Sequence, residues 1–416
     1  MNSWSDVYLP PIDPKFHFPT LSLRDSATEA VVALPIKSDY TMYVCGITPY
    51  DATHLGHAAT YLTFDLVNRY LTAMGKKVHF VENITDIDDP LLERANRDGI
   101  DWQDLAHSQI DLFRGDMSDL HVIPPENYIG AVEAIPLIIE AIEELQESDT
   151  VYSVEGDLYF QVNADEKFGT RSHLSNDEML TIFAERGGDP LRPGKKDPLD
   201  ALVWLSQRPG EPSWPSPFGA GRPGWHIECC AIAMAYLPLD THSDYMIDIQ
   251  GGGSDLLFPH HEMGAAQSRI LGRKDYARIY MYAGMIGLDG EKMSKSKGNL
   301  VFVSTLINQG SDPMAIRIAL LKGKYSQDRM WHNEQLLEAT ALINEIRLLL
   351  SRPEVAPTDW VIQEIVDSLS SDLDTPRAFR ALEKWCETCV AISETDDTGS
   401  AGELSRALDL LLGIAL

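Results

Sequence analysis

The architecture of this chain is set by residues 41–57, TMYVCGITPYDATHLGH. The apolar run MYVC is followed by a loop that contains Gly46 and Pro49, and the stretch ends in HLGH at residues 54–57. Apolar residues then recur at helical spacing as far as Gly75. The sequence therefore predicts a strand, a tight loop and a helix in that order.

Three chemically versatile side chains fall where this loop meets the helix. The predicted order places Cys45, His54 and His57 at the carboxyl edge of a parallel sheet, beside a helix N-terminus. Such an edge binds phosphate, because the first N–H groups of the helix are unpaired and the helix dipole is positive there.

The rest of the chain continues this pattern into an α/β fold, a doubly wound parallel sheet with an insertion and a C-terminal helical bundle. Apolar runs at residues 77–81, 245–249 and 280–286 predict further strands, and the last part of the chain shows helical periodicity. The predicted segments are an irregular N-terminal arm at 1–40, the first half of a nucleotide-binding catalytic domain at 41–125, a connective insertion at 126–195, the second half of the catalytic domain at 196–300 and the helical bundle at 301–416.

Composition narrows the class of protein. The 416 residues suffice for roughly two or three domains. With 34 basic and 63 acidic residues the formal net charge is −29, which counts against a long polyanionic partner. A polar, proline-rich beginning without a membrane-length apolar run predicts a cytoplasmic protein that does not enter a membrane. The five cysteines, an odd number without a secretion signal, argue against a disulfide framework.

A second motif lies far downstream, at residues 291–296, with the sequence EKMSKS. It resembles the KMSKS loop of class I aminoacyl-tRNA synthetases, and HLGH then resembles the HIGH motif of that class. The resemblance implies a Rossmann-like domain that activates a carboxylate with ATP and Mg²⁺. Catalysis of such a displacement depends on positioning and on neutralising charge at the phosphates. The predicted catalytic residues are His54, His57, Lys292 and Lys295.

Cysteine and histidine residues at three places predict a metal site. Cys45, Cys229 and His260 each fall at a sheet-edge loop or a helix start, so they can converge on one crevice. Three nitrogen and sulfur ligands with a vacant fourth position describe a catalytic or substrate-binding zinc site, not a structural one. Taken singly, each residue has an ordinary alternative, since cysteines are often small buried apolar residues and histidines are often hydrogen-bonded.

The segments around these residues resemble cysteinyl-tRNA synthetase. MYVCG, GWHIEC and GGGSDLLFPHHE stand where that family carries zinc ligands, and the chain departs from it at Gly264, where the synthetases have a ligating glutamate. The resemblance implies one Zn²⁺ whose fourth position takes the thiolate of cysteine. Serine, whose hydroxyl ionises less readily, would be rejected by a factor of roughly 10⁴ or more.

The same resemblance implies contacts to a cysteinyl-adenylate from the loops at the sheet edge. The predicted substrate- and ATP-binding residues are Cys45, Gly46, Ile47, Thr48, Thr60, Asn83, Ile84, Thr85, Trp225, Gly253, Ser254, Asp255 and Ile286.

Three features distinguish the acceptor from a tRNA. No basic module follows the catalytic domain, because residues 299–416 hold 10 Lys and Arg against 18 Asp and Glu. Ala59 replaces the arginine that follows HIGHA in the synthetase. GITPYDATHLGHAAT and ERGGDP, at residues 185–190, are closer to a sister family, the mycothiol-pathway cysteine ligase. That resemblance implies transfer of cysteine to the amine of glucosaminyl-inositol, with release of pyrophosphate and then AMP.

Two other functions stay open at this point. A cysteinyl-tRNA synthetase would esterify cysteine to tRNA, and a non-catalytic zinc- and thiol-binding module would bind cysteine without pyrophosphate exchange. The motifs favour the ligase, with L-cysteine, ATP and glucosaminyl-inositol as partners, no nucleic acid, and a monomeric chain.

Overall fold

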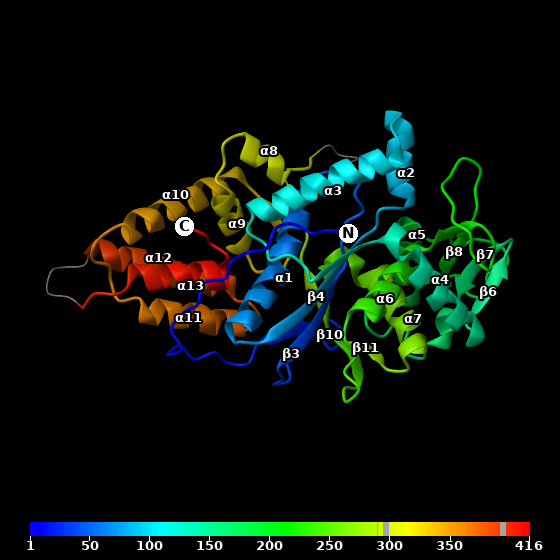
Figure 1. Cartoon of the computed structure of the whole chain (residues 1–416), viewed down its shortest axis with the longest axis horizontal. Coiled ribbons are helices and arrows are strands. Elements are labelled where there is room, and N and C mark those ends of the chain that lie inside the picture. The colour runs from blue at the N-terminus through cyan, green and yellow to red at the C-terminus, as the bar shows by residue number, and fades with distance from the viewer. Residues whose placement is uncertain (289, 294–298, 392–396) are drawn as a thin grey trace.

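A computed structural model describes residues 1–288, 290–293, 299–391 and 397–416. At its centre lies a sheet of five parallel strands in the order β11-β10-β3-β4-β5 (Figure 1). From β3 the chain builds outward through β4 and β5 on one side and through β10 and β11 on the other, so the predicted doubly wound parallel sheet is confirmed. The strands are β3 (Asp39–Val44), β4 (Lys77–Ile84), β5 (Asn127–Gly130), β10 (Tyr245–Gly253) and β11 (Asp275–Ala283).

Helices cover both faces of this sheet (Figure 1). One face packs on α1 (Leu55–Ala73), and the other packs on α4 (Ala131–Glu147), α6 (Trp225–Tyr236) and α7 (Glu262–Gly272). Successive side chains of a strand point to opposite faces. Met42 and Val44 of β3 accordingly join the core that contains α1, whereas Tyr43 and Cys45 join the core on the opposite face.

Helix α1 begins and ends as its sequence predicts. His54 is the N-cap, and its Nδ1 accepts hydrogen bonds from the backbone N–H groups of Gly56 (3.1 Å) and His57 (3.4 Å). The helix stops before Gly75, whose φ of +73° lies in the left-handed region that glycine adopts without strain. The predicted apolar stripe is buried at every position: Leu62, Leu66, Val67, Tyr70 and Leu71.

A second sheet is antiparallel and contains β6 (Val151–Val154), β7 (Asp157–Phe160), β8 (Ala201–Ser206) and β9 (Gly221–Pro223). The strands depart from the predicted ranges in two places. β5 lies inside the range predicted as the insertion but pairs with β4, and β8 and β9 lie beyond that range but continue the sheet of β7. A four-residue strand is too short to show a period, and pairing between distant segments is a tertiary contact that local patterns do not encode.

The N-terminal arm, predicted to be irregular, contains a hairpin of β1 (Ser22–Asp25) and β2 (Ala30–Ala33), so that prediction is wrong for these residues. Asp25 closes the turn, because its carboxylate accepts hydrogen bonds from the N–H groups of Ala27 and Thr28 and from the Thr28 hydroxyl (2.7 Å).

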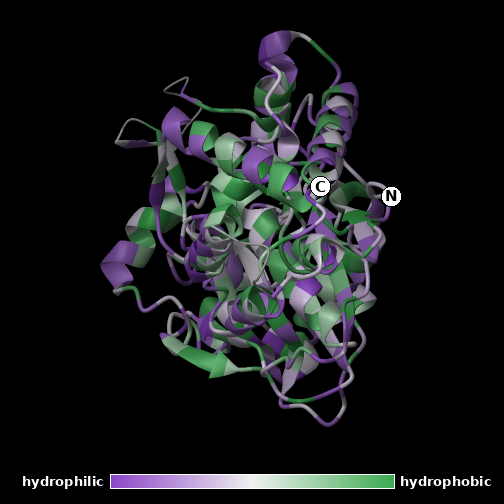
Figure 2. Cartoon of the chain, turned by 90° about the vertical axis from the view of Figure 1, so that its left-hand side faces the viewer, coloured by the Kyte–Doolittle hydropathy of each residue, from purple (hydrophilic) through white to green (hydrophobic). Residues whose placement is uncertain are grey.

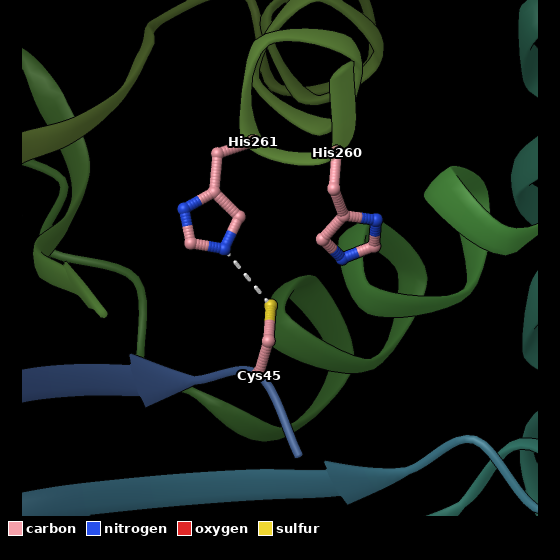
Figure 3. A group of neighbouring side chains, drawn as sticks. All are labelled: Cys45, His260 and His261. Carbon is pink, nitrogen blue, oxygen red and sulfur yellow. Dashed lines mark hydrogen bonds between the residues drawn. The ribbon is translucent and has the colours of Figure 1, made fainter. Parts of the chain in front are cut away.

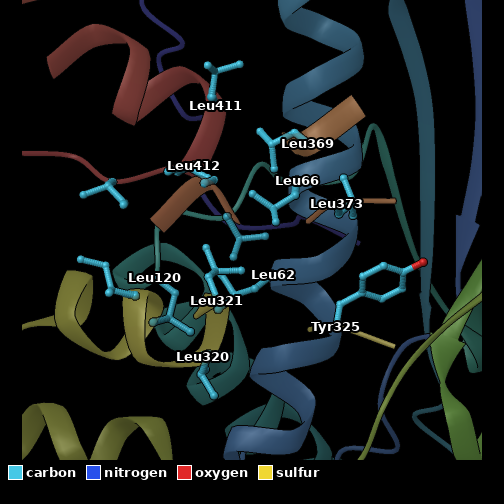
Figure 4. Close-up of a cluster of buried hydrophobic side chains, with 14 of the residues drawn as sticks. Leu62, Leu66, Leu120, Leu320, Leu321, Tyr325, Leu369, Leu373, Leu411 and Leu412 are labelled. Atoms are coloured by element: carbon cyan, nitrogen blue, oxygen red, sulfur yellow. The ribbon is translucent and has the colours of Figure 1, made fainter. Parts of the chain in front are cut away.

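The last part of the chain is mostly helical, with one three-residue strand, β14 (Arg329–Trp331). β14 pairs with β12 (Ile286–Leu288), which also pairs with β13 (Glu291–Lys292). In Figure 4, leucines of the tail pack against Leu62 and Leu66, so the bundle shares the core of α1. Its helices are α8 (Val303–Asn308), α9 (Pro313–Leu321), α10 (Asn333–Leu350), α11 (Asp359–Ser370), α12 (Thr375–Ala391) and α13 (Ala401–Leu412).

The remaining helices are α2 (Asp89–Asp98), α3 (Trp102–Asp119) and α5 (Asn176–Glu185), with short helical turns η1 (Val162–Ala164), η2 (Ser254–Leu256) and η3 (Leu257–His261). Hydrophilic and hydrophobic residues alternate along individual helices, as expected when a helix buries one face (Figure 2). Among the residues described, no helix combines the length and apolar character needed to cross a membrane.

Candidate active site

The carboxyl ends of β10, β3 and β4 lie side by side, because Val44 pairs with both Gly251 and Glu82. This edge brings together the residues that follow the three strands, which are far apart in sequence. Helix α1 begins after the loop at this edge, with His54 as its N-cap, and α6, which begins at Trp225, reaches the edge through Glu228 and its hydrogen bonds from Asn83 and Thr85. An open edge of this kind is where doubly wound sheets bind their ligands.

Gly46 lets the loop after β3 pass directly over the end of β4. A Cβ at this position would lie 1.6 Å from the carbonyl oxygen of Asn83. The Gly46 N–H donates to Asn83 Oδ1 (3.0 Å), and the Thr85 N–H donates to the carbonyl oxygen of Ile47 (3.1 Å). Four predicted substrate-binding residues are therefore joined in one hydrogen-bonded unit, and Thr48 and Ile84 are their chain neighbours.

The HLGH residues lie beside the segment that follows the KMSKS sequence. The rings of His54 and His57 stack with centroids 3.8 Å apart. The Leu55 N–H donates to the carbonyl oxygen of Val301 (2.9 Å), and the Val303 N–H donates to that of Thr53 (3.1 Å). The segment that follows the KMSKS sequence is thus held against the HLGH loop through backbone hydrogen bonds.

Of the two predicted catalytic lysines, Lys292 has only its backbone described, in β13, and Lys295 lies outside the described residues. Two other predicted contacts, Thr60 and Ile286, come from α1 and β12, and Thr60 lies beside the turn after β10, because a Cβ at Gly253 would be 3.8 Å from its hydroxyl oxygen. The hydroxyl of Thr60, one turn into α1, donates to the carbonyl oxygen of Gly56 (3.2 Å). Ile286, at the start of β12, is buried in the core that contains α1.

The three predicted metal ligands converge. His260 Nε2 lies 3.2 Å from Cys229 Sγ, and the ligand atoms of Cys45, His260 and His261 all lie within 4.8 Å of one another. Figure 3 shows both imidazoles pointing toward the Cys45 thiol, with His261 Nε2 at 3.1 Å from the sulfur. All four side chains are buried.

These donors fit a metal such as zinc, which prefers thiolate and neutral imidazole ligands. Burial, together with the neighbouring histidines, lowers the pKa of His260 well below its ordinary value, so the ring is neutral and able to ligate. Burial, and then the adjacent Cys45, raises the pKa of the Cys229 thiol, so metal binding there must release a proton. Trp225 stacks on His260 at a centroid distance of 4.4 Å and orients its ring.

A small cavity adjoins the cluster and is lined in part by Cys45, Cys229, His260 and Gly264. The cavity has a volume of about 10 Å³, which is roughly enough for one water molecule. A Cβ at Gly264 would approach only the carbonyl oxygen of His226, at 3.9 Å. The glycine therefore leaves open space at the position where a glutamate was expected from the synthetase resemblance.

Sequence reasoning missed three residues around this cluster. His261 follows the predicted ligand in PHHE, so the motif itself contained the signal. Gln250 Nε2 lies 3.0 Å from His261 Nε2, and the Tyr282 hydroxyl lies 2.9 Å from His261 Nδ1. The last two lie within strands β10 and β11 and carry no local signal that distinguishes them from other strand residues.

Glu228, within the GWHIEC segment, was missed as well. It is 2% exposed, and its Oε1 accepts hydrogen bonds from Asn83 Nδ2 (2.8 Å) and from the Thr85 hydroxyl (2.6 Å). Helix α6 therefore contributes the metal-ligand candidate Cys229 and also braces two predicted adenylate contacts.

The turn after β10 contains Gly253, Ser254 and Asp255, and an arginine from a distant loop holds it. Arg186 of the ERGGDP sequence donates from Nη1 to the carbonyl oxygens of Asp255 and Phe258. Because Phe258 lies two residues before His260, Arg186 links the insertion to the metal-ligand candidates.

Comparison with known proteins agrees with this geometry. The catalytic-domain family described as tRNA synthetases class I (C) matches residues 33–341. Proteins named L-cysteine:1D-myo-inositol 2-amino-2-deoxy-α-D-glucopyranoside ligase, from Thermomonospora curvata, Kribbella flavida and Mycolicibacterium smegmatis, are each 51% identical to this chain, with 100% of both chains covered.

Solved structures share the fold at low identity. Methionyl-tRNA synthetase of Mycobacterium tuberculosis, in complex with methionyl-adenylate, has a TM-score of 0.63 at 16% identity over 91% of this chain and 89% of that one. A leucyl synthetase of Agrobacterium radiobacter in a ternary complex has a TM-score of 0.60 at 11% identity over 96% and 84%. The chain is therefore built on the class I tRNA synthetase catalytic domain and belongs to the family of L-cysteine:1D-myo-inositol 2-amino-2-deoxy-α-D-glucopyranoside ligases.

Proposed function

We propose that this chain is an ATP-dependent ligase that activates L-cysteine as cysteinyl-adenylate and transfers it to the amine of glucosaminyl-inositol, a step of mycothiol biosynthesis. The observation that carries the proposal is the buried cluster of Cys45, Cys229 and His260 at the same sheet edge as the HLGH loop. That placement suits an amino acid that must present a thiol on one side and a carboxylate to ATP on the other.

In the first step the cysteine carboxylate attacks the α-phosphorus of ATP, and pyrophosphate leaves. His54 and His57 at the start of α1, with Lys292 and Lys295, are the proposed donors to the phosphates, and Mg²⁺ accompanies ATP. Their contribution is positioning and charge neutralisation, which dominate catalysis of phosphoryl and nucleotidyl transfer.

Cys45, Cys229 and His260 are the residues that would hold Zn²⁺, which when bound supplies a soft position for the substrate thiolate. The small cavity beside Gly264, with room for about one water molecule, suits the thiol group of that substrate. A hydroxyl in place of the thiol is a harder and far less acidic ligand, so the cluster favours cysteine over serine.

In the second step the amine of the acceptor attacks the carbonyl carbon of the adenylate, AMP leaves and an amide forms. The amine must give up a proton, and carboxylates at the sheet edge are candidates to accept it. Glu82 is excluded because its side chain is fully buried on the α1 side of β4. We assign the role to Asp51 or Asp86. A small cationic acceptor also suits a chain of net charge −29.

The test is turnover of ATP and cysteine by the purified protein, with glucosaminyl-inositol and tRNA supplied separately. We expect AMP release with the amino-sugar and none with tRNA. AMP release with tRNA alone would make the chain a cysteinyl-tRNA synthetase. Cysteine binding without pyrophosphate exchange would make it a non-catalytic thiol-binding module.

The metal ligands are tested by substitution. Cys229→Ala should lose bound zinc and the preference for cysteine over serine together, as measured by elemental analysis and by pyrophosphate exchange. Cys230→Ala is the matched control, because Cys230 is a buried neighbour that accepts a hydrogen bond from Ser268 (2.9 Å). Unchanged zinc content in Cys229→Ala refutes the ligand assignment.

A further inference from the structure

Glu228 is a buried carboxyl group beside the metal-ligand candidates, in the first turn of α6. Asn83 connects Glu228 to the substrate loop, because its Nδ2 donates to Glu228 Oε1 (2.8 Å) while its Oδ1 accepts from the Gly46 N–H (3.0 Å). The adjacent Cys229 thiol also lies within hydrogen-bond reach of Asn83. The carboxyl group therefore lies between the sulfur-binding cluster and the loop expected to contact the adenylate.

The partners of Glu228 differ from those of the buried carboxylates that form ion pairs in this chain. Glu262, equally buried, forms an ion pair with Arg171 (2.8 Å), and Asp65 pairs with Arg69 (2.7 Å). Within the described ranges, Glu228 has no lysine or arginine partner, and both of its hydrogen bonds come from neutral groups to Oε1. A buried carboxylate without a counter-charge is costly, and in an enzyme site the substrate can supply that charge.

The α-ammonium group of cysteine can supply this positive charge. Only two carbon atoms separate its sulfur from its α-ammonium nitrogen, so a cysteine whose sulfur lies at Cys45 and Cys229 must place its ammonium close to that cluster. Glu228 is the chain neighbour of Cys229, and Oε2 receives no hydrogen bond from the described residues. An ammonium donating to this oxygen would form a charge-assisted hydrogen bond, the stronger kind.

We infer that Glu228 binds the α-ammonium group of the cysteine substrate, and thereby makes the site specific for an amino acid over a thiol acid that lacks the amine. This inference rests on the proposed function. It assigns the amine end of the substrate to Glu228, as the metal cluster takes the thiol end.

The experiment compares cysteine with 3-mercaptopropionate, which has the same thiol and carboxylate but no amine. Pyrophosphate exchange is measured with each compound, for the wild type and for Glu228→Gln. The amide keeps the size of the side chain and can still accept hydrogen bonds from Asn83 and Thr85. We expect kcat/KM for cysteine to fall about 10- to 100-fold, and kcat/KM for 3-mercaptopropionate to change by less than about threefold.

The matched control is Glu82→Gln, which replaces another buried carboxyl group, in β4 on the opposite face of the sheet, near Tyr61 and Tyr128. This variant should change both compounds alike. If kcat/KM in Glu228→Gln falls equally for both compounds while the zinc content is unchanged, Glu228 only positions Asn83 and Thr85, and the inference is overturned.

A measurement on the wild type alone keeps the inference testable if the variant does not fold. Equal kcat/KM for cysteine and 3-mercaptopropionate would show that no group recognises the ammonium, and the inference fails. No cysteine-dependent exchange at all would instead count against the proposed function.

Discussion

The carbonyl oxygen of Asn83 occupies the space in which any side chain at position 46 would begin. Only glycine avoids this overlap, and the contact it permits joins the loop after β3 to the end of β4. We predict that Gly46→Ala displaces this loop and lowers kcat/KM for pyrophosphate exchange by about 100-fold, the usual effect of misplacing reacting groups by roughly 1 Å.

Gly115→Ala is the control for this substitution. Gly115 lies in α3, and an added Cβ there meets no atom within 4 Å. Alanine should raise the thermal midpoint slightly, because it favours helix by up to about 1 kcal/mol over glycine, and leave exchange unchanged. Equal activity of the two variants would contradict the role given to Gly46.

Residue types in short motifs predicted the metal-ligand candidates, because a loop after a strand and a helix start are local features of the sequence. Cys45, Cys229 and His260 come together as expected. Glu228 and Gln250 could not be found in this way, since their significance comes from partners on other strands and helices. Roles toward a bound substrate, for Ile286 and the others, stay predictions.

Between elements, Arg186 at the end of α5 connects the insertion to the site. Its guanidinium binds two carbonyl oxygens of the turns η2 and η3, which carry Asp255 and lead to His260. We predict that Arg186→Ala loosens this turn and reduces kcat/KM for pyrophosphate exchange about tenfold. The reduction in kcat/KM should be the same at every pH tested.

Lys196→Ala serves as the comparison. Lys196 is an exposed cation near the same loop, and it bonds Gln161 (3.1 Å), not the turn. If both variants exchange pyrophosphate equally fast, the hydrogen bonds of Arg186 do not position the site.

Elements with a long and regular period were predictable, and short ones were not. The apolar stripe of α1 repeats over several turns, so periodicity identified this helix. Strands β1, β2 and β5 have only four residues each. The pairing of β1 with β2 depends on the turn at Asp25, and the pairing of β5 depends on the edge of β4.

Across the whole molecule, one buried carboxylate connects the catalytic sheet to the helical bundle. Asp65 of α1 accepts hydrogen bonds from Arg69 (2.7 Å) and from Arg317 of α9, and Arg317 also donates to the carbonyl oxygen of Leu412 in α13 (2.7 Å). Both arginines and the aspartate are buried. Removing the negative charge leaves the two buried guanidinium groups with the more distant carboxylate of Asp409, 3.9 Å from Arg69, as their remaining counter-charge.

We therefore predict that Asp65→Asn lowers stability by about 3–5 kcal/mol, measured by urea unfolding. Burial acts to raise the pKa of Asp65, but Arg69 and Arg317 outweigh it, so the folded-state pKa lies below its ordinary value. A lowered folded pKa stabilises the protein above the unfolded pKa of about 4, and that stabilisation is lost as pH falls through the folded value.

The difference between wild type and Asp65→Asn should accordingly stay constant from neutral pH down to about pH 4 and shrink only below it. Asp98→Asn, which removes an exposed partner of Arg94 and Arg97, should change stability little. A difference that already narrows between pH 7 and pH 5 would be inconsistent with this assignment.

The alternation along β3 has a consequence for how this protein tolerates insertions and deletions. Met42 and Val44 belong to one core and Tyr43 and Cys45 to the other, and a shift of one residue turns every side chain of a strand to the opposite face. A single codon lost between residues 41 and 44 would turn the thiol of Cys45 toward the core that contains α1 and would leave Gly46, which has no side chain, in the place of the metal ligand. This strand can thus vary in residue type but not in length, and any natural length variation among relatives should fall outside it.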